Sequence, residues 1–111
     1  MTKENLKFKN DDFWVMKEGN MYRVGLSLDG LQSIGDISFI DLPDLGEINE
    51  GDPFLHVEAS KVASEFSSPL SGNISKVNRK LLEEMDRLSL HDSNKNWIAV
   101  FKEVKDTDAL N

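Results

Sequence analysis

The chain has 111 residues, with 13 Lys and Arg, 20 Asp and Glu and no Cys, a length that fits one domain, residues 1–111, with a single core. Its formal net charge of −7 argues against a nucleic-acid partner, because proteins that bind the phosphate backbone carry basic patches. The lack of Cys excludes a disulfide scaffold, a thiolate metal site and a thiol nucleophile.

The first quarter of the chain predicts a hairpin after a polar lead-in. Residues 1–12 are mostly polar, and we expect them to form a loose lead-in. Residues 13–17 and 21–27 are rich in apolar residues and bracket Glu-Gly-Asn, a glycine-containing turn signal, so they predict two paired strands. In residues 28–34 the apolar positions recur every three residues and a glycine follows, which favours one or two helical turns.

The central part of the chain predicts strands at residues 36–42 and 47–49, separated by a Pro-Asp-Leu-Gly turn. It then reaches the stretch GDPFLHVEASKVASEFSSPLSG, residues 51–72. Two runs in this stretch, residues 54–59 and 62–67, alternate with period two, which is typical of paired strands. The connection between them is about two residues, Ser60 and Lys61. The pattern therefore predicts a tight hairpin with Lys61 exposed at its bend.

The last part of the chain predicts a strand, a helix and another strand. Residues 73–77 read as a strand, and Asn78 is a suitable N-cap for a helix over residues 79–88. The apolar stripe of that helix would be Leu81, Leu82, Met85 and Leu88. Residues 89–96 form a polar loop in this interpretation, and residues 97–104 alternate as a final strand.

A short internal repeat accompanies these strands. GDISFID at residues 35–41 and GNISKVN at residues 72–78 share Gly, Ile and Ser at equivalent positions. Each copy opens a unit that later ends in an alternating strand, residues 54–59 in the first unit and residues 97–102 in the second.

The lysine hairpin resembles the lipoyl-attachment hairpin of the glycine cleavage system H protein family. The resemblance rests on VEASKVA at residues 57–63 and SPLSG at residues 68–72. It continues upstream through GDISFIDLP at residues 35–43, and it covers most of the chain, from about Trp14 to Val104. Together these motifs at this spacing are far more specific than a lysine with a glutamate three residues before it.

The resemblance implies the fold and the site residues. The implied fold is all-β, a barrel-sandwich hybrid of two antiparallel sheets with one or two short helices. Lys61 would carry lipoate through an amide bond, and Glu58, which matches the family's glutamate, would contribute to recognition by the ligase. We interpret Glu65 as a solvated carboxylate, and Gly35 and Gly72 as glycines needed by the backbone at turns.

The resemblance also implies a function without catalysis. The chain would be a lipoylated shuttle that carries an aminomethyl group between glycine decarboxylase (P protein), aminomethyltransferase (T protein) and dihydrolipoyl dehydrogenase (L protein). A lipoate-protein ligase would load it. The carrier itself would be no enzyme, so we assign no catalytic acid, base or nucleophile, and the protein supplies position while the cofactor supplies chemistry.

Three alternatives remain at the level of sequence. The first is a short H-like lipoyl carrier in a redox or stress pathway linked to ADP-ribosylation, in which an acid such as Asp29 would be modified. The second is a biotin carrier, but that class has methionines beside the lysine, where this chain has Ser60 and Val62. The third is an unmodified barrel used for protein contacts.

Other residues suggest structural roles and a location. His56 and His91 are too isolated to predict a metal site, and we expect Trp14 and Trp97 to fill the core. No apolar run has the length of a membrane span, and the start of the chain lacks the apolar segment of a signal peptide. We therefore expect a soluble, cytoplasmic monomer with no membrane or nucleic-acid partner.

Overall fold

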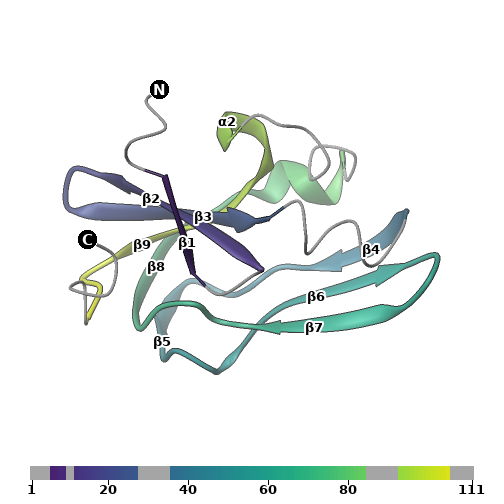
Figure 1. Cartoon of the computed structure of the whole chain (residues 1–111), viewed down its shortest axis with the longest axis horizontal. Helices are drawn as coiled ribbons and strands as arrows, with labels where there is room; N and C mark the ends of the chain where they lie inside the picture. The colour runs from purple at the N-terminus through teal and green to yellow at the C-terminus, as the bar shows by residue number, and fades with distance from the viewer. Residues whose placement is uncertain (1–5, 10–11, 28–35, 85–92, 106–111) are drawn as a thin grey trace.

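Two antiparallel sheets form the molecule (Figure 1). The computed structural model describes residues 6–9, 12–27, 36–84 and 93–105. One sheet has six strands in the order β1-β2-β3-β9-β8-β5, and the other has three in the order β4-β6-β7. The strands are β1 Leu6–Lys9, β2 Phe13–Glu18, β3 Met21–Leu26, β4 Ile37–Asp41, β5 Gly46–Ile48, β6 Pro53–Ala59, β7 Ala63–Ser67, β8 Gly72–Val77 and β9 Trp97–Lys102. The all-β prediction is confirmed.

The first hairpin forms where the sequence predicts it, but the lead-in differs. β2 and β3 pair with Glu18 opposite Met21, and Gly19 adopts a φ of 64° in the turn, a conformation that glycine reaches at no steric cost. The expectation of a loose lead-in is wrong for Leu6–Lys9, which form β1 and pair with β2. A neighbouring strand supplied this stretch with backbone partners, which its local pattern does not reveal.

The half-units suggested by the internal repeat are visible in the pairing. β4, from the first copy, pairs antiparallel with β6, and β8, from the second copy, pairs antiparallel with β9. The two pairs lie in different sheets. Each copy of the repeat therefore pairs with the alternating strand that ends its own unit, as two similar halves require.

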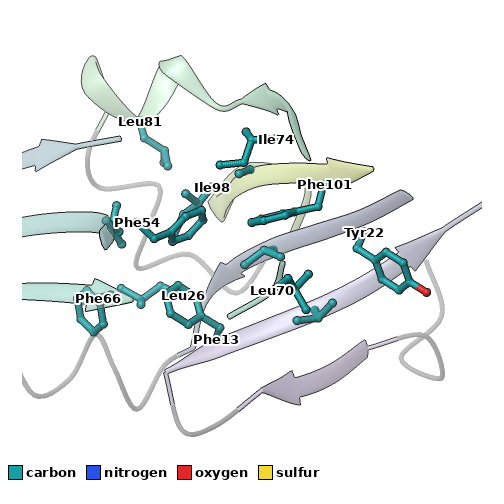
Figure 2. Packing of buried hydrophobic residues seen from close by; sticks show 14 of the residues in the cluster. Phe13, Tyr22, Leu26, Phe54, Phe66, Leu70, Ile74, Leu81, Ile98 and Phe101 are labelled. Atoms are coloured by element: carbon teal, nitrogen blue, oxygen red, sulfur yellow. The ribbon is translucent and has the colours of Figure 1, made fainter. Parts of the chain in front are cut away.

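Aromatic side chains join the two sheets in one core (Figure 2). The ring of Phe54 from β6 lies edge-on to that of Phe13 from β2, with centroids 5.6 Å apart. It also lies 5.8 Å from the ring of Phe101 on β9, and Phe66 of β7 contacts Phe13 at 6.0 Å. Although Phe54 alternates with Leu55, both are buried, because the β6–β7 register shifts between Pro53 and Leu55.

Trp14 is buried as expected, whereas Trp97 is only half-buried. Trp14 is buried but does not belong to the core cluster, whereas its neighbours Phe13 and Val15 do. Since successive side chains of a strand point to opposite faces, Trp14 covers the outer face of the six-stranded sheet. Its ring lies where a Cβ on Gly25 would be, so a glycine is required there. Trp97 is half-buried, and the Arg23 guanidinium lies 5.6 Å from its ring centroid.

The segment after β8 is a 3₁₀ turn at Arg79–Leu82 rather than the predicted start of an α-helix. Leu81 reaches the core as expected, but Leu82 is 46% exposed; Met85 and Leu88 lie outside the described residues. Asn78 makes no side-chain cap. Residues Ser93–Asn96, expected as loop, form the helical turn α2, and none of the helices described is long and apolar enough to span a membrane.

Candidate functional site

The β6–β7 hairpin places Lys61 at its bend. β6 ends at Ala59 and β7 begins at Ala63. The Ala59 amide donates to the Val62 carbonyl at 3.2 Å, so Ser60 and Lys61 span the bend as the alternating pattern predicts. In Figure 1 this bend lies at the far right, at the opposite side of the molecule from the β2–β3 turn. The backbone thus carries Lys61 well away from the six-stranded sheet.

Hydrogen bonds to β4 hold the bend in place. The Ser60 amide donates to the Asp36 carbonyl at 2.8 Å, and the Asp36 amide donates to the Ser60 hydroxyl oxygen at 3.0 Å. Next to them, the Ser38 hydroxyl donates to the Glu58 carbonyl at 3.1 Å. The residue immediately before Lys61 is therefore hydrogen-bonded twice to Asp36, the residue just before β4, which limits the movement of the bend.

The opposite end of the hairpin is fixed by the Ser-Pro-Leu-Ser-Gly turn. The Ser68 amide donates to the Asp52 carbonyl at 2.7 Å, and the Gly51 amide donates to the Ser68 carbonyl at 3.0 Å. The buried Ser68 hydroxyl donates to the Leu70 carbonyl at 2.8 Å. At Gly72 a Cβ would approach the Lys102 carbonyl oxygen to 3.0 Å. The close backbone approach explains why glycine suits this position; Gly35 lies outside the described residues.

The Lys61 side chain is open to solvent. Lys61 is exposed together with Ser60 and Ala63, and the side chain of Val62 is 45% exposed. Among the residues that the structure describes, no carboxylate lies within ion-pair distance of its amine. A primary amine at a braced, exposed bend is suited to acylation by an enzyme, because it can enter another protein's active site without unfolding its own support.

The two glutamates on either side of Lys61 meet at a histidine that sequence reasoning treated as isolated. His56 Nε2 lies 3.5 Å from Glu58 Oε2, and His56 Nδ1 lies 3.9 Å from Glu65 Oε2. Glu65 faces His56 across the strands, while Glu58 follows it by two residues on the same face. The two-residue bend already implied this register, so counting outward from Ser60 and Lys61 would have found the cluster.

The other candidate residues form no second site. In the described ranges, no group of three or more His, Cys, Asp and Glu side chains could hold a metal ion. His91 and Asp29 lie outside the described residues. At the bend itself, the exposed Lys61 amine is a nucleophile of the kind that forms an amide with a carboxylic acid.

Comparison with known proteins agrees with this geometry. The family model described as glycine cleavage H-protein matches residues 6–111. The glycine cleavage system H protein of Geobacillus thermodenitrificans (strain NG80-2) is 33% identical over 112 residues, covering 98% of this chain and 88% of the relative. The glycine cleavage system H protein of Carboxydothermus hydrogenoformans is 34% identical over 96 residues, which cover 86% of this chain and 74% of the relative.

A solved structure supports the fold. The crystal structure of a glycine cleavage system H protein from Mycobacterium marinum superposes with a TM-score of 0.78 over 88% of this chain and 83% of that chain. The sequence identity is 23%, so this likeness concerns the fold. The prediction of a barrel-sandwich arrangement of two antiparallel sheets is confirmed by it.

Proposed function

This chain belongs to the glycine cleavage H-protein family, and on that premise we propose that Lys61 is the residue that carries its lipoyl group. The protein is a non-catalytic lipoyl carrier of the glycine cleavage system, and it interacts with the enzymes of that system. In this proposal the whole chain, residues 1–111, acts as one carrier domain.

The observation that carries the proposal is the position of Lys61 at a braced and exposed bend. A ligase that transfers an activated acid to an amine needs access to that amine and a backbone that keeps its shape on docking. The Ser60–Asp36 hydrogen bonds and the turn at Ser68 supply that rigidity at both ends of the hairpin. We propose that Glu58, which is exposed on β6 three residues before Lys61, takes part in recognition by the ligase.

The lipoyl group supplies the two thiols that this cysteine-free chain lacks and thereby carries the aminomethyl group. The protein's own contribution is mechanical: the two sheets hold the hairpin, and the hairpin holds the point of attachment. We propose glycine decarboxylase, aminomethyltransferase and dihydrolipoyl dehydrogenase as the enzymes that the arm visits, and lipoate-protein ligase as the enzyme that loads it.

Intact-mass spectrometry tests the assignment of Lys61. After incubation with lipoate, ATP and lipoate-protein ligase, we expect the wild-type chain to gain the mass of one lipoyl group. Lys61→Ala and Lys61→Arg should gain none, because neither offers a primary amine at the bend. Lys80→Ala, which removes another exposed lysine, is the matched control and should be modified like the wild type.

Two results would contradict the proposal. Modification of the Lys61→Arg variant would show that another amine accepts the group, and an unmodified wild-type chain would show that the bend is no substrate. The role in glycine cleavage has its own test. With purified glycine decarboxylase, the lipoylated protein should support exchange between bicarbonate and the glycine carboxyl group, and the Lys61→Arg variant should not.

A further inference from the structure

The basic residues of this protein are unevenly distributed along the chain, whereas its acidic residues are not. Lys61 is the only Lys or Arg between residues 24 and 75, although the chain has 13 of them. Among the described residues, every other Lys or Arg lies on the six-stranded sheet or on a segment adjoining its strands. The acids of this stretch are Asp29, Asp36, Asp41, Asp44, Glu47, Glu50, Asp52, Glu58 and Glu65. The part that presents Lys61 is therefore the acidic part.

Several of these acids share the outer face of the three-stranded sheet. Asp41 of β4 is opposite His56 of β6, and His56 is opposite Glu65 of β7. Phe39 is opposite Glu58 in the next row toward the bend. We call these residues the hairpin face: Phe39, Asp41, His56, Glu58 and Glu65. It contains no Lys or Arg, and among the described residues none of its three carboxylates lies within ion-pair distance of a Lys or Arg.

The hairpin face also offers an aromatic contact and a hollow. Phe39 is 47% exposed, and its ring lies edge-on to His56 with centroids 6.3 Å apart. At the end remote from Lys61 the face opens into a recess of about 370 Å³, lined on its polar side by Asp41, Asp44, Glu47, His56 and Glu65. Buried Phe54 and Leu55 contribute to its lining. An exposed aromatic side chain with polar groups around it matches the arrangement of a protein interface, in which an aromatic anchor has a polar rim.

We propose that the hairpin face is the surface through which the enzymes that act on Lys61 dock, and that they do so with a patch of Lys and Arg side chains. This inference rests on the proposed role of Lys61 and adds the chemistry of its partners. Carboxylates arranged in rows across a sheet complement basic side chains, with Phe39 supplying the apolar contact. Acylation converts the Lys61 ammonium into a neutral amide, so the loaded protein has no Lys or Arg charge left in residues 24–75.

Electrostatic docking of this kind acts mainly on the rate of association. Complementary charge can raise association rates by factors of about 10 to 1000 at low salt, and the gain falls steeply as ionic strength rises. Lipoylation by lipoate-protein ligase gives a convenient measure, because kcat/KM reports the encounter with the unloaded chain. If docking depends on charge, kcat/KM should fall as the NaCl concentration rises; if docking depends on shape alone, kcat/KM should change little.

The experiment compares two triple variants that remove the same three negative charges. Asp41→Asn, Glu47→Gln and Glu65→Gln neutralise the hairpin face and its recess and leave Glu58 in place. Glu83→Gln, Glu84→Gln and Glu103→Gln neutralise exposed acids elsewhere. At low salt we expect the first triple to lower kcat/KM by about tenfold and to flatten its salt dependence. The second triple should stay within about twofold of the wild type if position rather than net charge decides.

Each outcome separates the hypotheses. An equal loss of kcat/KM in both triple variants would mean that only net charge matters. No loss in either variant would mean that the hairpin face is not used. Either result overturns this inference and leaves the proposed function of Lys61 untouched. Failure of the wild type to be lipoylated overturns the proposed function first. A reversible dimer in sedimentation that Phe39→Ala abolishes would mean that a second copy of this chain occupies the face, which also overturns the inference.

Discussion

At the scale of single residues, Ser60 does more than fill the bend. Its amide and its hydroxyl both bond to the backbone of Asp36, which lies just before β4. A serine hydroxyl in a turn often bonds to a nearby amide of its own turn, but this one reaches across to another strand. The residue beside the proposed attachment point is thus the link between the bend and the rest of the three-stranded sheet.

Ser60→Ala should loosen the bend without unfolding the protein. It removes the acceptor of the Asp36 amide, and a hydrogen bond of this type contributes about 0.5–1.5 kcal/mol. Hydrogen–deuterium exchange at the Asp36 amide should therefore quicken by up to about tenfold, with little change in Tm. Ser60→Thr keeps the acceptor and should restore protection; slow exchange in the alanine variant would refute the role given to this hydroxyl.

At the scale of elements, Asn78 connects the end of β8 to the start of β9. Its side-chain amide donates to the Lys95 carbonyl at 3.2 Å and to the Trp97 carbonyl at 2.9 Å. Its backbone amide donates to the Ile98 carbonyl at 2.9 Å. The side chain thus satisfies carbonyls where the chain leaves α2 and enters β9, in place of the helix cap that its position in the sequence suggests.

Asn78→Ala should destabilise the protein by about 1–3 kcal/mol, because two carbonyls lose their donor at a buried position. Urea unfolding followed by circular dichroism measures the loss. Asn78→Asp has the same shape but presents an oxygen to both carbonyls, so it should cost more than alanine. If aspartate were tolerated better than alanine, the contact would depend on shape rather than on donation.

At the scale of the whole molecule, the two sheets depend on one shared core. Phe54 of the three-stranded sheet contacts Phe13 and Phe101 of the six-stranded sheet, and all three are buried. The hairpin that carries Lys61 is continuous with β6, so the same side chains that stabilise the fold also position the site. Weakening the contact between the sheets should therefore lower the stability of the protein and also disturb the position of the hairpin that carries Lys61.

Phe54→Ala should lower the free energy of unfolding by about 3–5 kcal/mol, the usual cost of emptying an aromatic site in a core. Phe39→Ala is the same substitution at a 47% exposed position, and it should change stability by less than about 0.5 kcal/mol. Thermal and urea unfolding of the pair measure the difference. Equal losses would show that Phe39 is part of the core rather than of the hairpin face.

The signals that could be read from the sequence were the local ones. Alternation with period two identified β6, β7 and β9, because side chains on the two faces of a strand meet different surroundings, and a glycine-containing turn signal between two apolar runs identified β2 and β3. The spacing of the two runs placed Lys61 at the bend and already contained the register that brings Glu65 to His56. Motifs around Lys61 indicated the family, and the family model matches residues 6–111.

The remaining features depend on contacts between segments distant in sequence. Leu6–Lys9 form a strand because β2 lies beside them. The Asn78 side chain bonds to carbonyls near β9 instead of capping a helix, and Trp14 faces outward from the core. In each case the contact exists only after folding. A polar segment can form a strand if its neighbour offers free amides and carbonyls, and an asparagine bonds to whichever carbonyls lie within reach. The strands from β2 onward, the bend and the lysine on it could all be predicted from the sequence alone. What surrounds them could not, because hydrogen bonding and packing join segments that only folding brings together.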